Sequence, residues 1–122
     1  MGGAGALKLA FNHPDVFGVV GADSPSLHLD DGTFTLSGTG PDFARCEPLN
    51  LAATRPGLRT LRIWIDAGEL DPWLDRDRVL AGILSARGIA YEWRVMPGGH
   101  AGPYWQHSAP SYLRFYDTAF HH

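Results

Sequence analysis

Apolar residues fall into two patterns that alternate along the chain. Short apolar runs predict buried strands at residues 16–22 and 61–65, and alternation of apolar and polar residues predicts an edge strand at 90–96. Apolar positions three or four residues apart predict three helices. The first starts in the glycine-rich segment 2–5 and ends at Pro14, and the others cover about 74–87 and 109–120. The order helix, strand, excursion, strand, helix, strand, helix is typical of an α/β domain with a parallel sheet of about three strands.

Each predicted helix has an apolar face and a boundary signal. Pro14 ends the first helix, Gly88 follows the second, and Pro110 suits the first turn of the third. The apolar faces consist of Leu7, Ala10 and Phe11 in the first helix, Val79, Leu80, Ile83 and Leu84 in the second, and Leu113, Tyr116 and Phe120 in the third.

Residues 28–57 form the least regular part of the chain. They are rich in Gly, Pro, Thr and Asp, which is typical of an excursion from a scaffold. Within them, Thr33–Leu36 alternates as a small strand would, and Leu49–Thr54 has the length of one or two helical turns. We expect this excursion to cover the carboxyl edge of the sheet, and we expect residues 1–122 to form a single domain.

Composition narrows the class of protein. The 122 residues carry a formal net charge of −3 and a single lysine, Lys8, which argues against a nucleic-acid partner. Neither a signal peptide nor an apolar run of membrane-spanning length is found, so we expect a cytoplasmic protein with no membrane partner. The lone cysteine, Cys46, permits no intrachain disulfide and is interpreted as a small buried apolar residue.

Several acids and one histidine come after the predicted strands. Asp23 ends the first strand, Asp66 and Asp71 come after the second, and His100 lies in a glycine-rich loop after the third. Parallel strands end at the same edge, where ligands bind in α/β sheets. Asp71 precedes Pro72 and also suits a helix N-cap. Asp66 and Glu69 are better explained as structural or solvated residues.

The remaining histidines are weaker candidates. His13, before Pro14, is expected at the surface away from this edge, His107 is expected not to take part, and His28 stays undecided.

Taken in order, these motifs resemble the last part of an α/β-hydrolase. Met1-Gly2-Gly3 before a helix is similar to the segment directly after the nucleophilic serine of the Gly-x-Ser-x-Gly elbow. Gly68–Asp71 looks like the acid turn, Pro97–His100 looks like the histidine loop, and Tyr104-Trp105, Leu113 and Tyr116 resemble the closing helix. The resemblance is to the esterase group that includes esterase D (S-formylglutathione hydrolase), enterochelin esterase and feruloyl esterase.

The resemblance implies a truncated, three-layer α/β-hydrolase. His100 would be the base and Asp71 the acid of the triad, whereas the serine and the earlier strands of the family are missing from this chain. Ser24 and Ser26 lie near the edge, but neither stands in a nucleophile elbow. The strand edge at 17–22 would then be unpaired, so we expect a homodimer that completes the sheet through this edge.

Two functions fit these residues. The first is hydrolysis of a small ester or phosphoester by water, which His100 activates while Asp71 orients it. A divalent metal such as Zn²⁺ is an option here, with His100, Asp71, Asp66 and Asp23 as ligands. Gly2 and Gly3, at a helix start, would bind an oxygen of the substrate. The alternative is a non-catalytic fragment, or half of a split serine esterase whose partner carries the serine.

Overall fold

Three parallel strands form the sheet. The computed structural model describes residues 1–31, 34, 36 and 38–121, and within them the strand order is β1 (Val19–Asp23), β2 (Arg62–Gly68) and β3 (Glu92–Met96). Val19 is opposite Arg62, and Trp64 is opposite Glu92. The predicted small parallel sheet is therefore confirmed, with β3 at one edge.

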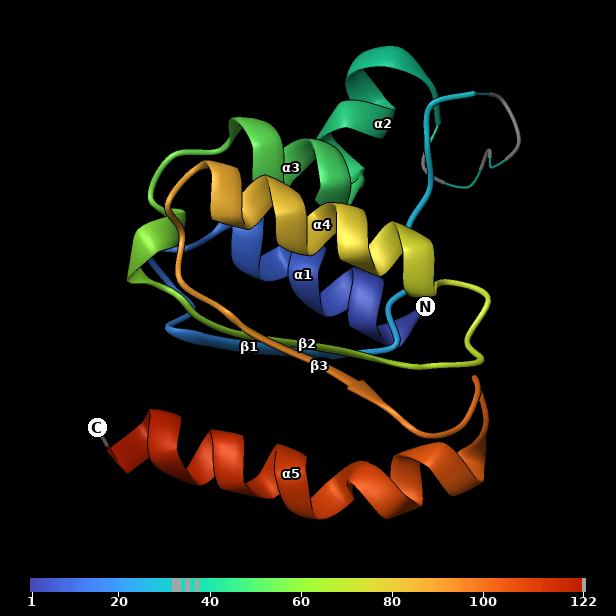
Figure 1. Ribbon diagram of the computed structural model, residues 1–122. Helices are drawn as coiled ribbons and strands as arrows, with labels where there is room; N and C mark the ends of the chain where they lie inside the picture. The colour runs from blue at the N-terminus through green and yellow to red at the C-terminus, as the bar shows by residue number, and fades with distance from the viewer. Residues whose placement is uncertain (32–33, 35, 37, 122) are drawn as a thin grey trace.

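Helices cover both faces of this sheet and make three layers (Figure 1). One face carries α1 (Gly2–Asn12), α3 (Pro48–Thr54) and α4 (Leu74–Ala86), with α2 (Gly40–Cys46) packed on α3. In the part of the chain that the structure describes, the other face carries only α5 (Gly102–His121). A single 3₁₀ turn, η1 (Leu58–Thr60), leads into β2.

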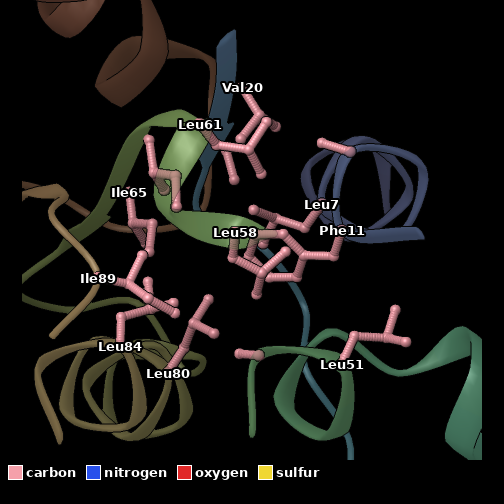
Figure 2. Close-up of a cluster of buried hydrophobic side chains, with 14 of the residues drawn as sticks. Leu7, Phe11, Val20, Leu51, Leu58, Leu61, Ile65, Leu80, Leu84 and Ile89 are labelled. Atoms are coloured by element: carbon pink, nitrogen blue, oxygen red, sulfur yellow. The ribbon is translucent and has the colours of Figure 1, made fainter. Parts of the chain in front are cut away.

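The hydrophobic core lies between the sheet and the α1, α3 and α4 layer (Figure 2). Side chains from all these elements point toward one another there, including Leu7 and Phe11 of α1, Ile65 of β2 and Leu80 of α4. Each of these four residues is 0% exposed. Burial of each such side chain contributes about 1.5–3 kcal/mol before entropy is counted. The apolar spacing that predicted the first two helices therefore selects the faces that meet in the core.

Two strands differ in extent from their prediction. β1 begins at Val19, because Val16 and Phe17 lie in an exposed turn after α1. β2 continues through Asp66, Ala67 and Gly68, where the sequence suggested a break. These three residues pair with Arg94, Val95 and Met96 of β3. Pairing with a neighbouring strand outweighs the weak strand propensity of Asp, Ala and Gly.

The last helix is longer than the sequence predicted. α5 begins at Gly102 and runs through Pro110, which therefore lies inside the helix and not in its first turn. Its buried residues are Tyr104, Ser108 and Phe115, whereas Leu113 and Phe120 of the expected apolar face are exposed. Contacts on both sides of Pro110 hold the helix to the sheet, which offsets the backbone hydrogen bond that a proline cannot make. Within the described part of the chain, no helix is both long and apolar enough to cross a membrane.

Most of the excursion joins the helical layer instead of covering the carboxyl edge. α3 packs against α1 and α4, and it confirms the helical turns expected at Leu49–Thr54. The small strand expected at Thr33–Leu36 includes Thr33 and Thr35, which lie outside the described residues. Cys46 was interpreted as a buried apolar residue, but the structure leaves it only half-buried.

α4 buries a carboxyl group in its first turn. Its core face is Leu80 and Leu84, while Val79 is 49% exposed. Asp77 is 0% exposed, and neither of its carboxyl oxygens has a hydrogen-bond partner among the described residues. Burial, followed by the charges of Asp71 and Asp66, raises the pKa of Asp77 to about 9. Asp77 is therefore a neutral acid inside the fold at neutral pH.

The open edge of strand β1 leads to a testable prediction of a homodimer. Among the described residues, β1 pairs with β2 on one side only. An open strand edge next to exposed Val16 and Phe17 favours pairing with a second copy. We expect light scattering at micromolar concentration to give twice the monomer mass of 13.3 kDa. Replacement of Val19 by proline, which removes a backbone N–H on the open side of β1, should lower that mass. A wild-type monomer would contradict this prediction.

Candidate active site

The two loops after β2 and β3 bring an acid and a histidine together at the carboxyl edge of the sheet. Nδ1 of His100 donates a hydrogen bond to Oδ2 of Asp71, at 3.0 Å. The other carboxyl oxygen of Asp71 accepts the backbone N–H of Trp73, at 2.8 Å. The Asp71 side chain is fully buried, and that of His100 is 32% exposed. The pair predicted from the sequence therefore exists, with the acid inside and the base at the surface.

Asp71 does not cap helix α4 in the way its position before Pro72 suggested. The N-cap position belongs to Trp73, two residues later. Asp71 instead closes the turn that precedes the helix, through the Trp73 N–H and through its own carbonyl, which accepts the N–H of Leu74 at 3.1 Å. This turn fixes the carboxyl group in place before it meets His100.

Backbone hydrogen bonds tie the acid turn to the histidine loop. The N–H of Glu69 donates to the carbonyl of Met96, and that of Leu70 donates to the carbonyl of Gly98, both at 2.9 Å. Gly98 has φ +113°, a conformation that favours glycine. The ring of Trp105 packs edge-on against His100 at 5.1 Å between centroids. The orientation of His100 is therefore set by several contacts besides Asp71.

His100 faces a hollow of about 420 Å³ next to the start of α1. Gly2 is the first helical residue, so the earliest backbone N–H groups of α1 have no partner within the helix. A Cβ on Gly3 would lie 3.2 Å from Pro25, so α1 packs closely on the segment after β1. The residues lining the hollow are Met1, Gly2, Gly3, Gly21, Asp23, Ser24, His100 and Trp105. The two glycines predicted to bind substrate therefore lie beside the predicted base.

The four residues predicted as metal ligands do not form one group. Asp66 is 0% exposed and accepts hydrogen bonds from Nε1 of Trp64 at 2.6 Å and from the hydroxyl of Tyr104 at 2.7 Å. Its partner across the sheet is Asp23, which lines the same hollow as His100. In the described ranges, no three His, Cys, Asp or Glu side chains are placed to hold a metal ion. This geometry does not fit the predicted zinc site, because both oxygens of Asp66 and both of Asp71 already accept hydrogen bonds from neighbouring donors.

Ser24 has a backbone conformation and a burial that the sequence did not predict. It lines the hollow, has φ +53° and is only 1% exposed. Its hydroxyl has no partner among the described side chains and backbone groups. A non-glycine residue in this left-handed conformation is uncommon and often marks a functional site. The signal in the sequence was its place directly after a strand, which alone does not predict the backbone conformation.

The other histidines discussed above do not take part in the Asp71–His100 pair. His13 is exposed, as the sequence suggested, and His107 is exposed on α5. His28 stacks on Phe34 at 3.7 Å between ring centroids and touches Trp73 edge-on. Glu69 is exposed, in keeping with its interpretation as a solvated acid, and Ser26 is buried.

Replacement of Gly68 by alanine should disturb this edge. A Cβ there would overlap the carbonyl of Gly98 and lie 2.7 Å from its carbon atom. We expect Gly68→Ala to lower the free energy of unfolding by about 1–3 kcal/mol. The control is Gly82→Ala on α4, where a Cβ meets no atom within 4 Å and helix propensity should add about 0.5–1 kcal/mol. Urea unfolding measures both, and equal effects would contradict the contact.

The family and the fold of this chain are identified by comparison with known proteins. The family described as "Putative esterase" matches residues 1–116. No curated protein is significantly similar in sequence. Among solved structures, a ferulic acid esterase is 24% identical with a TM-score of 0.77, covering 94% of this chain and 47% of that one. S-formylglutathione hydrolase from Staphylococcus aureus is 18% identical with a TM-score of 0.72, covering 94% of this chain and 50% of that one.

A third solved structure adds a further likeness of fold. The fluorophosphonate-binding serine hydrolase F of Staphylococcus aureus is 20% identical with a TM-score of 0.68, covering 93% of this chain and 50% of that one. The chain therefore spans about half the length of the solved structures it matches. These likenesses confirm the resemblance and the fold class predicted from the sequence. Because the family match extends over nearly the whole chain, the protein belongs to this esterase family.

Proposed function

We propose that this chain provides the acid and base of an ester-hydrolysing site, with His100 as general base and Asp71 as the residue that orients it. The observation that carries the proposal is the 3.0 Å hydrogen bond between Nδ1 of His100 and the buried Asp71 carboxyl group. Membership of the esterase family supports the same chemistry.

The orientation of the imidazole decides which nitrogen can act. The carboxylate of Asp71 only accepts hydrogen bonds, so it holds the proton of the ring on Nδ1. Nε2 is then left with its lone pair at the exposed side of the ring. A buried carboxylate also stabilises the imidazolium that forms when Nε2 takes a proton. The pair is therefore set up to accept a proton from a hydroxyl group in the hollow.

The reaction can be derived from this proton acceptor. Nε2 takes a proton from water while the water oxygen bonds to the ester carbonyl carbon. The tetrahedral oxyanion collapses, the bond to the leaving alkoxide breaks, and the imidazolium returns the proton to that alkoxide. The N–H groups of Gly2 and Gly3, at the start of α1 beside His100, are suited to stabilise the oxyanion. Phosphoesters were also predicted as substrates. Their hydrolysis would use the same base, but the water oxygen would bond to phosphorus in line with the leaving oxygen.

Mutation of the pair tests this proposal. With purified protein and aryl esters, we expect His100→Ala to lower the hydrolysis rate by about 10²-fold or more, and Asp71→Asn to lower it by a smaller factor because the ring loses its orientation. His107→Ala, an exposed histidine on α5, serves as the matched control and should leave the rate unchanged. An unchanged rate in His100→Ala would contradict the proposal, and loss of activity in EDTA with recovery in zinc would instead restore the metal prediction.

A second candidate is supported by the position of Met1. Met1 lines the hollow that His100 faces, and the chain spans about half the length of the serine hydrolase that it matches. A serine hydroxyl supplied by a partner polypeptide at this point would meet Nε2 of His100. The chain would then be the acid and base half of a split serine esterase.

Complementation distinguishes the two candidates. We expect the split-enzyme form to be inactive alone and to gain esterase activity when mixed with an amino-terminal half from a structurally similar esterase. The gain in activity should vanish when the nucleophilic serine of the added half is replaced by alanine. It should also vanish with His100→Ala in this chain. If no complex forms by light scattering and the chain is active alone, the split-enzyme candidate is wrong.

A further inference from the structure

Two carboxyl groups that the proposed mechanism does not use lie side by side under helix α5. Asp23 of β1 and Asp66 of β2 are direct register partners on neighbouring strands. Strand alternation places both on the face of the sheet opposite the hydrophobic core, which α5 covers (Figure 1). Asp66 is 0% exposed and Asp23 is half-buried. Two ionised acids in such a place would repel each other strongly.

The hydrogen bonds around Asp66 show which group holds the proton. Oδ2 of Asp66 accepts from the indole of Trp64 at 2.6 Å, and Oδ1 accepts from the hydroxyl of Tyr104 at 2.7 Å and that of Tyr112 at 3.4 Å. All three partners donate in these contacts, so Asp66 acts as the carboxylate. Asp23 lies opposite Asp66 on the paired strand, and its buried Oδ1 has no hydrogen-bond partner among the described residues. Because Asp66 already accepts from three donors, a proton held between the two carboxyl groups is carried by Asp23. Asp23 is therefore the protonated member of the pair.

The electrostatics agree with this assignment. Burial, followed by the charge of Asp66 and the hydrogen bond to it, raises the pKa of Asp23 to about 7. Burial also raises the pKa of Asp66, and the hydrogen bonds from Tyr104 and Trp64 oppose that rise. The pair therefore keeps one proton up to about neutral pH.

Other ionisable groups pack near the pair from each neighbouring element. Tyr116 joins Tyr104 and Tyr112 on α5, and burial raises its pKa. Arg94 of β3 is the register partner of Asp66, but its guanidinium lies 5.4 Å from the Trp64 ring centre and 3.8 Å from Glu92. Asp77 of α4 interacts with Asp66 and has a pKa of about 9. Met1 and His100 line the hollow that Asp23 also lines.

Tyr104 connects this pair to the histidine loop. It lies four residues after His100 in the first turn of α5 and is 3% exposed. Its ring packs on Gly98, where a Cβ would lie 3.2 Å from Cδ2 of Tyr104. The bond from Tyr104 to Asp66 therefore fastens the start of α5 and the loop before it to the centre of the sheet.

We propose that Asp23 and Asp66 share one proton, and that this singly ionised pair positions His100 by holding Tyr104 against the sheet. Loss of the shared proton puts two negative charges side by side and loosens the start of α5. The positioning of a base rests on the proposed function, whereas the shared proton and the hold on α5 are measured without any activity.

The direction of the pH effect is set by linkage. The pKa of Asp23 is raised in the fold from 3.8 to about 7, so the folded chain binds this proton more tightly than the unfolded chain. The stability that this group contributes is complete below about pH 4. It is lost as the pH rises through about 7, with no further loss from this group above that point. The hold on α5 should weaken over the upper part of the same range.

The indole N–H of Trp64 gives a direct readout, because it donates to Asp66. In ¹⁵N-labelled protein, with Trp64→Phe to assign the signal, we expect the Trp64 indole peak to titrate with a midpoint near pH 7. Amide protection factors in the first turn of α5 should fall by about tenfold or more across the same range. A Trp64 peak that does not move between pH 5 and 9 would overturn the proposal.

Matched variants identify the titrating group. In Asp23→Asn the amide still donates to Asp66 but cannot ionise, so the titration should vanish while the melting temperature at pH 6 is kept. Asp77→Asn, which removes the other buried acid of raised pKa, should leave the titration in place. A titration that persists in Asp23→Asn, or vanishes only in Asp77→Asn, would overturn the assignment. The wild-type titration still decides the matter if a variant does not fold.

Two more substitutions separate positioning from stability. Asp66→Asn places an amide N–H against the donors Trp64 or Tyr104, so it should lower the melting temperature by more than about 5 °C, unlike Asp23→Asn. Tyr104→Phe should leave the Trp64 titration intact but reduce amide protection at the start of α5, and unchanged protection would overturn the hold on α5. If His100→Ala keeps esterase activity while the Trp64 titration is observed, the proposed function fails and the shared proton stands.

Discussion

Strand β2 is the element on which the rest of the structure depends. It is hydrogen bonded to β1 on one edge and to β3 on the other, and it is buried along nearly its whole length. One face supplies Ile63 and Ile65 to the core, and the other supplies Trp64 and Asp66 to the layer under α5. Parallel pairing in this register brings the ends of all three strands to one edge, so the acid turn after β2 meets the histidine loop after β3.

The two faces of the sheet are held by different interactions. The α1, α3 and α4 face is an apolar core whose stability comes from burial of aliphatic and aromatic side chains. The α5 face is a mixed layer in which tyrosine hydroxyls and an indole N–H surround two carboxyl groups. Such a polar layer is favourable only while every buried group is paired, which makes it sensitive to a single proton. The same helix carries Trp105 against His100.

The site itself is rigid on one side and open on the other. Asp71 is buried and bonded twice, and the histidine loop is tied to the acid turn by backbone hydrogen bonds. The hollow beyond His100 is lined by the first residues of α1, whose backbone N–H groups are free of helical partners. This arrangement supplies an oriented base and donors for an oxyanion. The source of the hydroxyl nucleophile separates the two candidate functions.

The sequence by itself determined the order of the elements, the parallel sheet, the core faces of α1 and α4, the esterase family and the Asp71–His100 pair. These depend on local signals, because apolar spacing selects a buried face and chain order fixes which loops meet at the carboxyl edge. Only the tertiary structure decided the extent of β2, the passage of α5 through Pro110, the burial of Asp77, the conformation of Ser24 and the bonding of Asp66 to α5 and Trp64. Three of these depend on partners distant in sequence. β3 extends β2, the sheet holds α5 on both sides of Pro110, and the phenols of α5, together with the Trp64 indole, occupy the oxygens of Asp66 that a metal would have needed.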